Sequence, residues 1–330
     1  MKNKMMHNEY FQYLIRLLGA ILCASVLVTC GDASDSSTAS STEVEMPQVA
    51  ENFEATPSEL IEPVDENSFA YEADRFADIR MLRYQVAGFD ALSTSQKELL
   101  YYLSQAALSG RDIMYDQNYK HNLRIRRTIE EVIQHYNGDR NTESFNNFIT
   151  YAKQMWFANG IHHHYSSAKF TPLFDQQFFA ELVTNSAASA NYPLRENQDV
   201  DQLIAELTPI LFDPTLDAKK VNTANGVDKV VTSAVNFYEG VTEQEVIDFY
   251  AARSDSSDEN PVSHGLNSKL IKVDGEVTEQ VWRVGGMYSA ALEQVVYWLE
   301  RAITVAENDK QKTALELLVK YYRSGDLEDF

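Results

Sequence analysis

Hydrophobic residues recur at helical spacing along most of the chain from about Tyr71 to its last residue. Apolar positions at i, i+3, i+4 and i+7 give a helix one apolar face, and runs of this kind alternate here with helix-start and helix-stop signals. The sequence therefore predicts a body of successive amphipathic helices. The clearest patterns cover residues 95–109, 125–136, 142–159, 242–250, 287–305 and 313–322, and weaker ones cover 174–185, 199–211 and 227–238.

Capping residues place two of these helices more closely. Ser95 and Glu98 have the spacing of a capping box ahead of an apolar run, and Gly110 is a plausible stop for that helix. Thr242 and Glu245 repeat the same spacing ahead of a shorter run. Both pairs predict a helix that begins just after the hydroxyl residue.

The period of the pattern changes once, near residue 270. Two short β-type runs, 270–273 and 276–282, flank Asp274-Gly275, and Asp-Gly between such runs is the strongest local signal for a β-hairpin. Two isolated strands are only marginally stable, so the hairpin must dock on other strands or on helices. The predicted fold class is α+β, mainly helical.

The first thirty residues have the pattern of a targeting segment. Lys2, Lys4 and Arg16 precede an apolar run of 13 residues, 17–29, which is too short to span a bilayer comfortably. The run ends at Cys30, in an arrangement similar to a bacterial lipoprotein signal, where the cysteine receives lipid. We therefore expect residues 1–30 to be a signal peptide, Cys30 to be lipidated, and the protein to be exported and anchored to a bacterial membrane. The alternative is a plain signal peptide that contains a cysteine.

Composition and charge add a tether and exclude one class of partner. Residues 31–68 are mostly Ser, Thr, Asp and Glu, and residues 31–70 hold ten acidic residues and no Lys or Arg. Such a segment cannot bury enough apolar surface to fold, so we expect a disordered, extended tether. The net charge of the whole chain is −21, which argues against nucleic acid as a partner because phosphates are bound by cationic surfaces.

Several short blocks of the body resemble bacterial dipeptidyl peptidase III, a zinc metallopeptidase family that removes dipeptides from the N-termini of peptides. The blocks occur in the family's order and extend from about Tyr71 to the last residue. They are Phe76-Ala77-Asp78-Ile79 with Leu82-Arg83-Tyr84, Tyr101 to Ala107, Gly110 to Ile113, Asp116-Gln117-Asn118, Asn159 to Tyr165 with Lys169-Phe170, Gly265 to Lys269, and Gly285-Gly286-Met287-Tyr288.

The resemblance implies a two-lobed enzyme in which a lower lobe of helices and a small β-barrel faces a zinc-bearing helical lobe. Residues 69–330 would form part of the lower lobe. The family's zinc motifs, His-Glu-x-x-x-His and Glu-Glu-x-x-Ala-Asp, do not occur in the 330 residues. We therefore expect short peptides as substrates and zinc as cofactor for the family enzyme, but no bound zinc and no hydrolysis for this chain alone. The alternative is a non-catalytic lipoprotein that binds peptides or another partner.

The resemblance also points to a substrate-binding block with three successive histidines. By position in the block, Asn159, His164 and Tyr165 are expected to contact substrate, although Tyr165 is equally an ordinary packing residue. The histidines 162–164 are metal-ligand types, but adjacent side chains point in different directions, and in an extended segment only His162 and His164 share a face. Imidazoles that bond to backbone are the favoured interpretation, so no metal site is predicted.

Two other groups of polar residues have ordinary explanations. Glu131 and His135, spaced i, i+4, are expected to form an exposed polar helix face. The arginines at 124, 126 and 127 are expected to pair with neighbouring acids. The sequence contains no glycine-rich phosphate loop and no nucleophile elbow around a serine.

Overall fold

The computed structural model describes residues 69–254 and 261–330. Phe69–Phe330 forms one compact unit. The predicted signal peptide, Cys30 and the acidic tether lie outside the described residues. Within the part that is described, no helix combines the length and the apolar character needed to cross a membrane.

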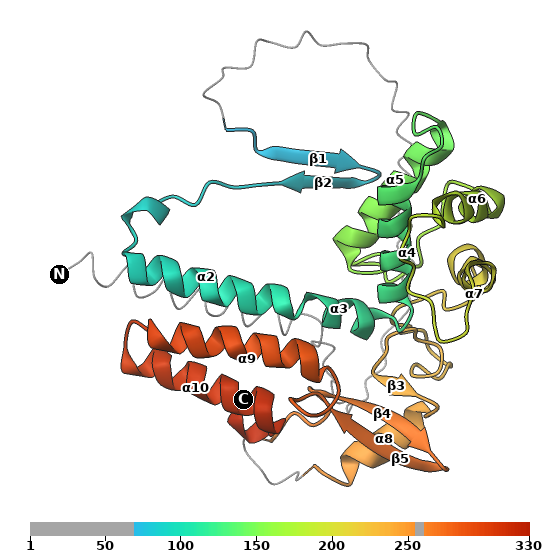
Figure 1. The fold of residues 1–330 in the computed structure, drawn as a ribbon. Helices are drawn as coiled ribbons and strands as arrows, with labels where there is room; N and C mark the ends of the chain where they lie inside the picture. Colours follow the sequence, from blue (N-terminus) through green and yellow to red (C-terminus); the bar gives the residue numbers. More distant parts are fainter. Residues whose placement is uncertain (1–68, 255–260) are drawn as a thin grey trace, which may run out of the picture. The chain divides into compact units, whose positions relative to one another are not determined.

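The described residues are mainly helical, with two small sheets (Figure 1). In chain order the elements are β1 Glu72–Phe76, β2 Ile79–Leu82, η1 Phe89–Ala91, α2 Thr94–Ser109, α3 Arg111–Asn118, α4 Asn122–His135, α5 Glu143–Ala158, α6 Gln176–Ser186, α7 Val200–Phe212, β3 Tyr238–Glu239, α8 Glu243–Ala251, β4 Ser268–Val273, β5 Glu276–Val281, α9 Ser289–Thr304, α10 Asp309–Ser324 and η2 Leu327–Asp329. The prediction of an α+β, mainly helical class is confirmed.

The capping box of α2 lies two residues earlier than predicted. Ser93 Oγ accepts the amide of Gln96 at 3.2 Å, and Gln96 Oε1 accepts the amide of Ser93 at 2.9 Å. The pair at 95 and 98 has the same spacing, but the Gln96 side chain also donates to Glu307 at 2.5 Å. This contact across the sequence fixes the earlier start. The capping box predicted for α8, Thr242 with Glu245, is confirmed.

Gly110 is the C-cap of α2, which confirms the predicted stop, and it is also the residue from which α3 begins. Its backbone is right-handed helical, with φ −85° and ψ −4°, and α3 follows immediately. The sequence pattern missed the β1–β2 hairpin. Salt bridges of Glu72 with Arg75 and Arg80 lie along it, and the strands are too short and exposed for a clear alternation.

The helix predicted at 227–238 is wrong. Asp228 instead accepts the backbone amides of Val230, Val231 and Glu243 through its carboxylate. Such side-chain bonds to nearby amides compete with helix formation. Ala234 then pairs with Lys219 by a backbone hydrogen bond, so the segment is built into a tertiary contact.

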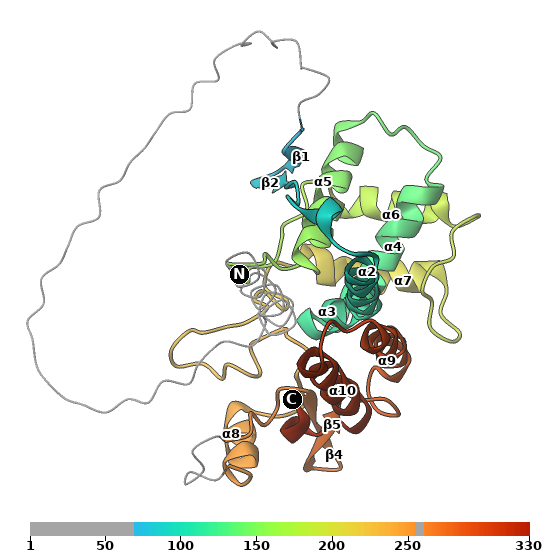
Figure 2. The same cartoon turned by 90° about the vertical axis from the view of Figure 1, so that its left-hand side faces the viewer.

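Buried apolar side chains form three separate clusters. The largest unites α4, α5, α6 and α7, the second lies between α2, α9 and α10, and the third joins α8 to β3 and β4. In the second cluster α9 lies alongside α2 on one side and α10 on the other (Figures 1 and 2). In the largest cluster, the side chains with no more than 1% exposure include Ile125, Phe148, Met155, Ile161, Leu182 and Leu203.

Both sheets are open among the described residues, so the expected small β-barrel is not formed there. β1 pairs only with β2, and the second sheet has the order β3-β4-β5. The predicted hairpin is confirmed as β4 and β5, which pair antiparallel from Ser268↔Val281 to Val273↔Glu276. A barrel needs further strands to close the edges, and here β3 contributes only two residues.

One buried amide links three segments of the largest cluster. Asn122 Nδ2 donates to the carbonyl of Tyr115 at 3.0 Å, and Asn122 Oδ1 accepts the amide of Ile161 at 3.1 Å. A longer contact of 3.5 Å reaches the carbonyl of Asn159. The side chain therefore ties the end of α3 and the start of α4 to the chain that leaves α5.

We expect Asn122→Ala to lower the free energy of unfolding by roughly 2–4 kcal/mol, because buried backbone groups lose their partners. Urea titration followed by circular dichroism measures the change. Asn147→Ala, which removes a single more exposed bond to the carbonyl of Leu173, is the matched control and should cost under about 1 kcal/mol. Equal losses in the two variants would contradict this role of Asn122.

Candidate functional site

Helix α5 ends at a residue predicted to contact substrate. Asn159 adopts a left-handed conformation, with φ 53°, which ends the helix. Gly160 follows with φ 150°, and a Cβ added there would lie 2.1 Å from Asn122 Nδ2. Only glycine fits this close approach. The backbone carbonyl of Asn159 accepts a hydrogen bond from Asn118 Nδ2 at 3.0 Å. In the structure Asn159 therefore acts through its backbone, which sets the direction of the chain after α5.

The chain then forms a turn that we call the imidazole turn, residues 162–169. It is held by backbone bonds to the segment 217–220: Lys169 donates to Ala218 at 3.0 Å and Lys220 donates to Ser167 at 2.8 Å. Lys169 Nζ also donates to the carbonyl of Ile210 at 3.0 Å, at the end of α7. The turn is therefore anchored on both sides by elements distant in sequence.

His162 is the buried member of the turn. Its Nε2 lies 2.7 Å from the carbonyl oxygen of Asp217, so this nitrogen carries the proton and donates. Burial, which penalises the charged imidazolium, lowers the pKa of His162 to about 4, although the Asp217 carbonyl opposes the shift. His162 is therefore neutral at physiological pH and serves to fix the turn.

His163 uses one ring nitrogen to shape the turn and directs the other outward. Its Nδ1 accepts the amides of Tyr165 and Ser166, both at 3.1 Å. A nitrogen that accepts two amides carries no proton, which assigns the proton of the neutral ring to Nε2. That nitrogen lies 3.7 Å from the carboxylate of Asp78, in the turn between β1 and β2.

The ring of His164 stacks on the ring of His163. The two ring centroids are 4.4 Å apart with the planes 24° from parallel. The geometry of an extended segment, in which only His162 and His164 would share a face, does not apply here because residues 164–166 form a turn. Burial, followed by the neighbouring His163, lowers the pKa of His164.

Tyr165 is the most exposed large hydrophobic side chain of the described residues, at 87%. Its ring lies 4.3 Å from the ring of His164, and His164 in turn contacts the ring of Phe157 at 5.0 Å. The tyrosine is therefore positioned by ring contacts while most of its surface faces solvent. Packing in the core, the alternative for this residue, is excluded by that exposure.

The imidazole turn offers aromatic and imidazole surface. Across residues 69–254 and 261–330, no group of three His, Cys, Asp or Glu side chains lies close enough to hold a metal ion. The ring nitrogens His162 Nδ1 and His164 Nδ1 are buried and have no hydrogen-bond partner in this part of the chain. What the geometry provides is a surface on which a flat or extended polar ligand can lie.

The other candidate residues have structural partners. Arg124 pairs with Glu206 at 3.1 Å, and Arg126 pairs with Asp112 at 2.7 Å, which confirms the expected ion pairs. Glu131 lies 3.4 Å from His135, but it also accepts the amide of Asn191 at 2.7 Å. Glu131 therefore holds the loop at Asn191 in place, in addition to forming part of a polar helix face.

No sequence pattern signalled the polar junction between the three hydrophobic clusters. The carboxylate of Asp116 accepts from Asn236 at 3.0 Å and from the hydroxyl of Tyr288 at 2.6 Å. The buried ammonium of Lys269 donates to Asn236 at 2.8 Å and pairs with Glu239. Three of these residues lie in the blocks that carry the family resemblance, but only the tertiary structure brings them together.

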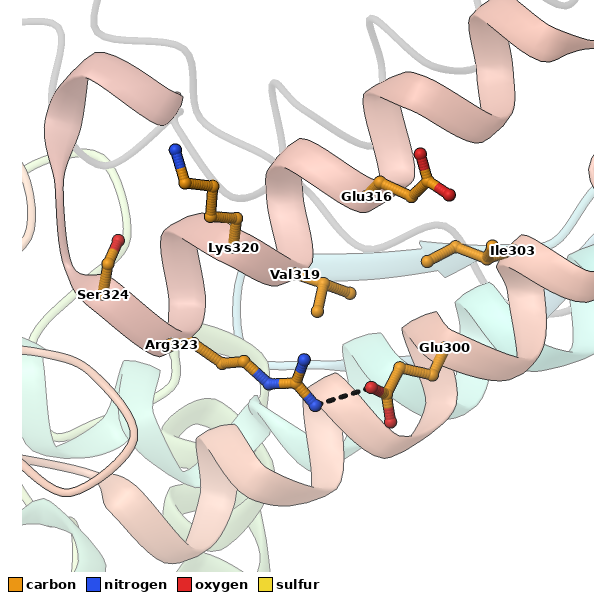
Figure 3. Close-up of a pocket in the computed structure, with 7 residues that line it drawn as sticks. All are labelled: Glu300, Ile303, Glu316, Val319, Lys320, Arg323 and Ser324. Atoms are coloured by element: carbon orange, nitrogen blue, oxygen red, sulfur yellow. Dashed lines mark hydrogen bonds and ion pairs between the residues drawn. The ribbon is translucent and has the colours of Figure 1, made fainter.

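Two grooves lie along the C-terminal helices, away from the imidazole turn. The first, of about 540 Å³, lies between α9 and α10 (Figure 3). Its charges are paired: Arg323 reaches Glu300 at 2.6 Å, and Lys320 pairs with Asp329 at 2.6 Å. The second, of about 610 Å³, adjoins β5 and the ends of α9 and α10.

Comparisons with known proteins give one structural similarity. No protein-family model and no curated protein matches the sequence. A solved structure of DPP III from Caldithrix abyssi is similar over 73% of this chain and 33% of that chain, with 15% sequence identity and a TM-score of 0.40. The chain thus spans about a third of the length of that protein. Similarity at this level does not assign the chain to the family.

The pKa of His162 predicts a loss of stability in mild acid. The pKa of His162 is about 4 in the folded state and about 6.5 in the unfolded chain. Between these two pH values the imidazole is therefore protonated in the unfolded state and neutral in the folded state. The free energy of unfolding should therefore fall as pH decreases through this window, by roughly 2 kcal/mol between about pH 7.5 and about pH 5. Urea titrations at the two pH values measure it.

His162→Gln should remove the share of this pH dependence that comes from position 162, because that position then has no imidazole to protonate; His121 and His164, whose pKa values burial also lowers, keep their share. His264→Gln, which removes an exposed imidazole, is the matched control and should keep the wild-type loss. A His162→Gln protein that destabilises in acid as steeply as the wild type would contradict the assignment.

Proposed function

We propose that this chain forms part of the peptide-binding wall of a zinc-dependent exopeptidase of the dipeptidyl peptidase III type. The proposal rests on the ordered sequence blocks and on one observation at the site. That observation is the exposed ring of Tyr165, which the stacked imidazoles hold in place with 87% of its surface exposed. An aromatic side chain held rigid and solvent-facing is suited to bind a ligand, because little conformational entropy is lost on contact.

In this proposal Tyr165 and His164 contact the peptide, and Asn159 sets the direction in which they are presented. The imidazole turn binds and orients the peptide. The zinc ligands of the family lie in the two motifs that the 330 residues do not contain. A dipeptidyl-naphthylamide mixed with the purified chain should therefore release no naphthylamine. Release that co-purifies with the chain would overturn this assignment. A non-catalytic peptide-binding lipoprotein, attached through Cys30, is the second candidate and predicts the same result for this assay.

Tyr165→Ala should weaken the binding of a short peptide with a free N-terminus, such as tetra-alanine labelled at its C-terminal end, by about fivefold or more. Fluorescence anisotropy measures the dissociation constant. Tyr84→Ala is the matched control, because Tyr84 is also exposed, at 73%, and lies outside the turn. Unchanged affinity in the Tyr165 variant would remove the turn from the proposed site.

A further inference from the structure

In the part of the chain that the structure describes, β5 is an edge strand, paired with β4 on one side only. Trp282 donates to the carbonyl of Asn267 at 2.7 Å, and Leu270 donates in the opposite direction to Phe237 at 2.9 Å. Since backbone bonds alternate along an antiparallel pair, the register sets Gln280, Thr278 and Glu276 as the residues bonded to β4. The amides and carbonyls of Val277, Glu279 and Val281 therefore point away from β4.

Part of this edge, at Glu279 to Val281, borders the second groove. The groove is lined by Glu279, Gln280, Val281, Arg283, Gly286, Met287, Ser324, Gly325 and Asp326. Two glycines pack closely against the end of this edge at Val281: a Cβ at Gly286 would lie 2.8 Å from the carbonyl oxygen of Val281, and a Cβ at Gly325 would lie 2.5 Å from the Val281 side chain. A strand edge beside an open groove is a template for an added strand.

The groove also contains an unpaired positive charge. Among the described residues, Arg283 is the arginine whose guanidinium contacts no carboxylate, no hydrogen-bond acceptor and no aromatic ring. The two acids of the groove are already engaged: Glu279 accepts from Ser268 Oγ at 2.6 Å, and Asp326 accepts the amide of Glu328 at 3.0 Å. In a chain of net charge −21, an unpaired guanidinium is well placed to bind a carboxylate.

Strand β5 ends at Val281, two residues before this charge. Beyond Val281 the chain turns, with Trp282 bridged to Met287, and Val284 donates to the carbonyl of Tyr322 at 2.9 Å. A strand added along β5 cannot continue past this turn. A chain terminus therefore fits this end of the groove better than a continuous segment does.

We propose that the β5 edge and Arg283 form a docking site for the C-terminus of an extended peptide, which adds parallel to β5 and places its terminal carboxylate on the Arg283 guanidinium. The outward amides and carbonyls of β5 supply the backbone bonds, and Arg283 selects the terminus. The site is separate from the imidazole turn and does not depend on the function proposed for it.

The probe is the hexapeptide Thr-Val-Thr-Val-Thr-Val, capped with fluorescein at its N-terminus and carrying a free C-terminal carboxylate. Anisotropy with the full chain should show saturable binding that weakens at least about tenfold when the carboxylate is replaced by an amide. Absence of saturable binding, or binding that is insensitive to the amide, would overturn the proposal.

Arg283→Gln should weaken binding of the carboxylate peptide at least about tenfold and leave the amide peptide unchanged, while Arg283→Lys should restore part of the loss. Arg253→Gln is the matched control, since Arg253 bonds the carbonyl of Phe249 on α8. Glu279→Pro removes one outward amide and should weaken both peptides, provided its urea midpoint matches the wild type. Tyr165→Ala should leave binding at the β5 edge unchanged, so the proposals for the two sites can be contradicted separately.

Discussion

The position of the imidazole turn depends on one buried amide, the side chain of Asn122. It bonds backbone groups of α3 and of the chain that leaves α5. Gly160 passes so close to this amide that no other side chain fits. Because both partners are backbone groups, the amide fixes where the chain leaves α5 and not only which residues touch. The ring contacts from Phe157 to Tyr165 follow from that direction.

The three hydrophobic clusters are joined by polar contacts rather than by continuous apolar packing. Asp116, Asn236 and Lys269 form a chain of hydrogen bonds between α3, the segment before β3, and β4, and Tyr288 adds the start of α9. Buried polar groups are costly unless they are satisfied, but when they are satisfied they fix one arrangement. The junction therefore specifies how the clusters meet, while the clusters supply most of the stability.

The two surfaces proposed to bind peptides use different physics. The imidazole turn presents the exposed ring of Tyr165, which ring contacts with His164 hold in place. The β5 edge presents unpaired backbone groups beside the guanidinium of Arg283. The first contacts side chains or peptide planes in many sequences, whereas the second requires an extended main chain and a carboxylate. The groove between α9 and α10 lacks either feature, because its charges are already paired.

Local sequence determined the helices with long apolar periodicity, the Asp-Gly hairpin and the α8 capping box, since spacing and turn chemistry act over a few residues. It also identified the residues of the imidazole turn, but not their geometry. Partners distant in the chain decide three features: the shape of the imidazole turn, the absence of a helix at 227–238, and the polar junction. Asp228 illustrates the reason: its carboxylate binds nearby amides and the start of α8 together, and this combined tertiary contact outweighs a weak helical preference.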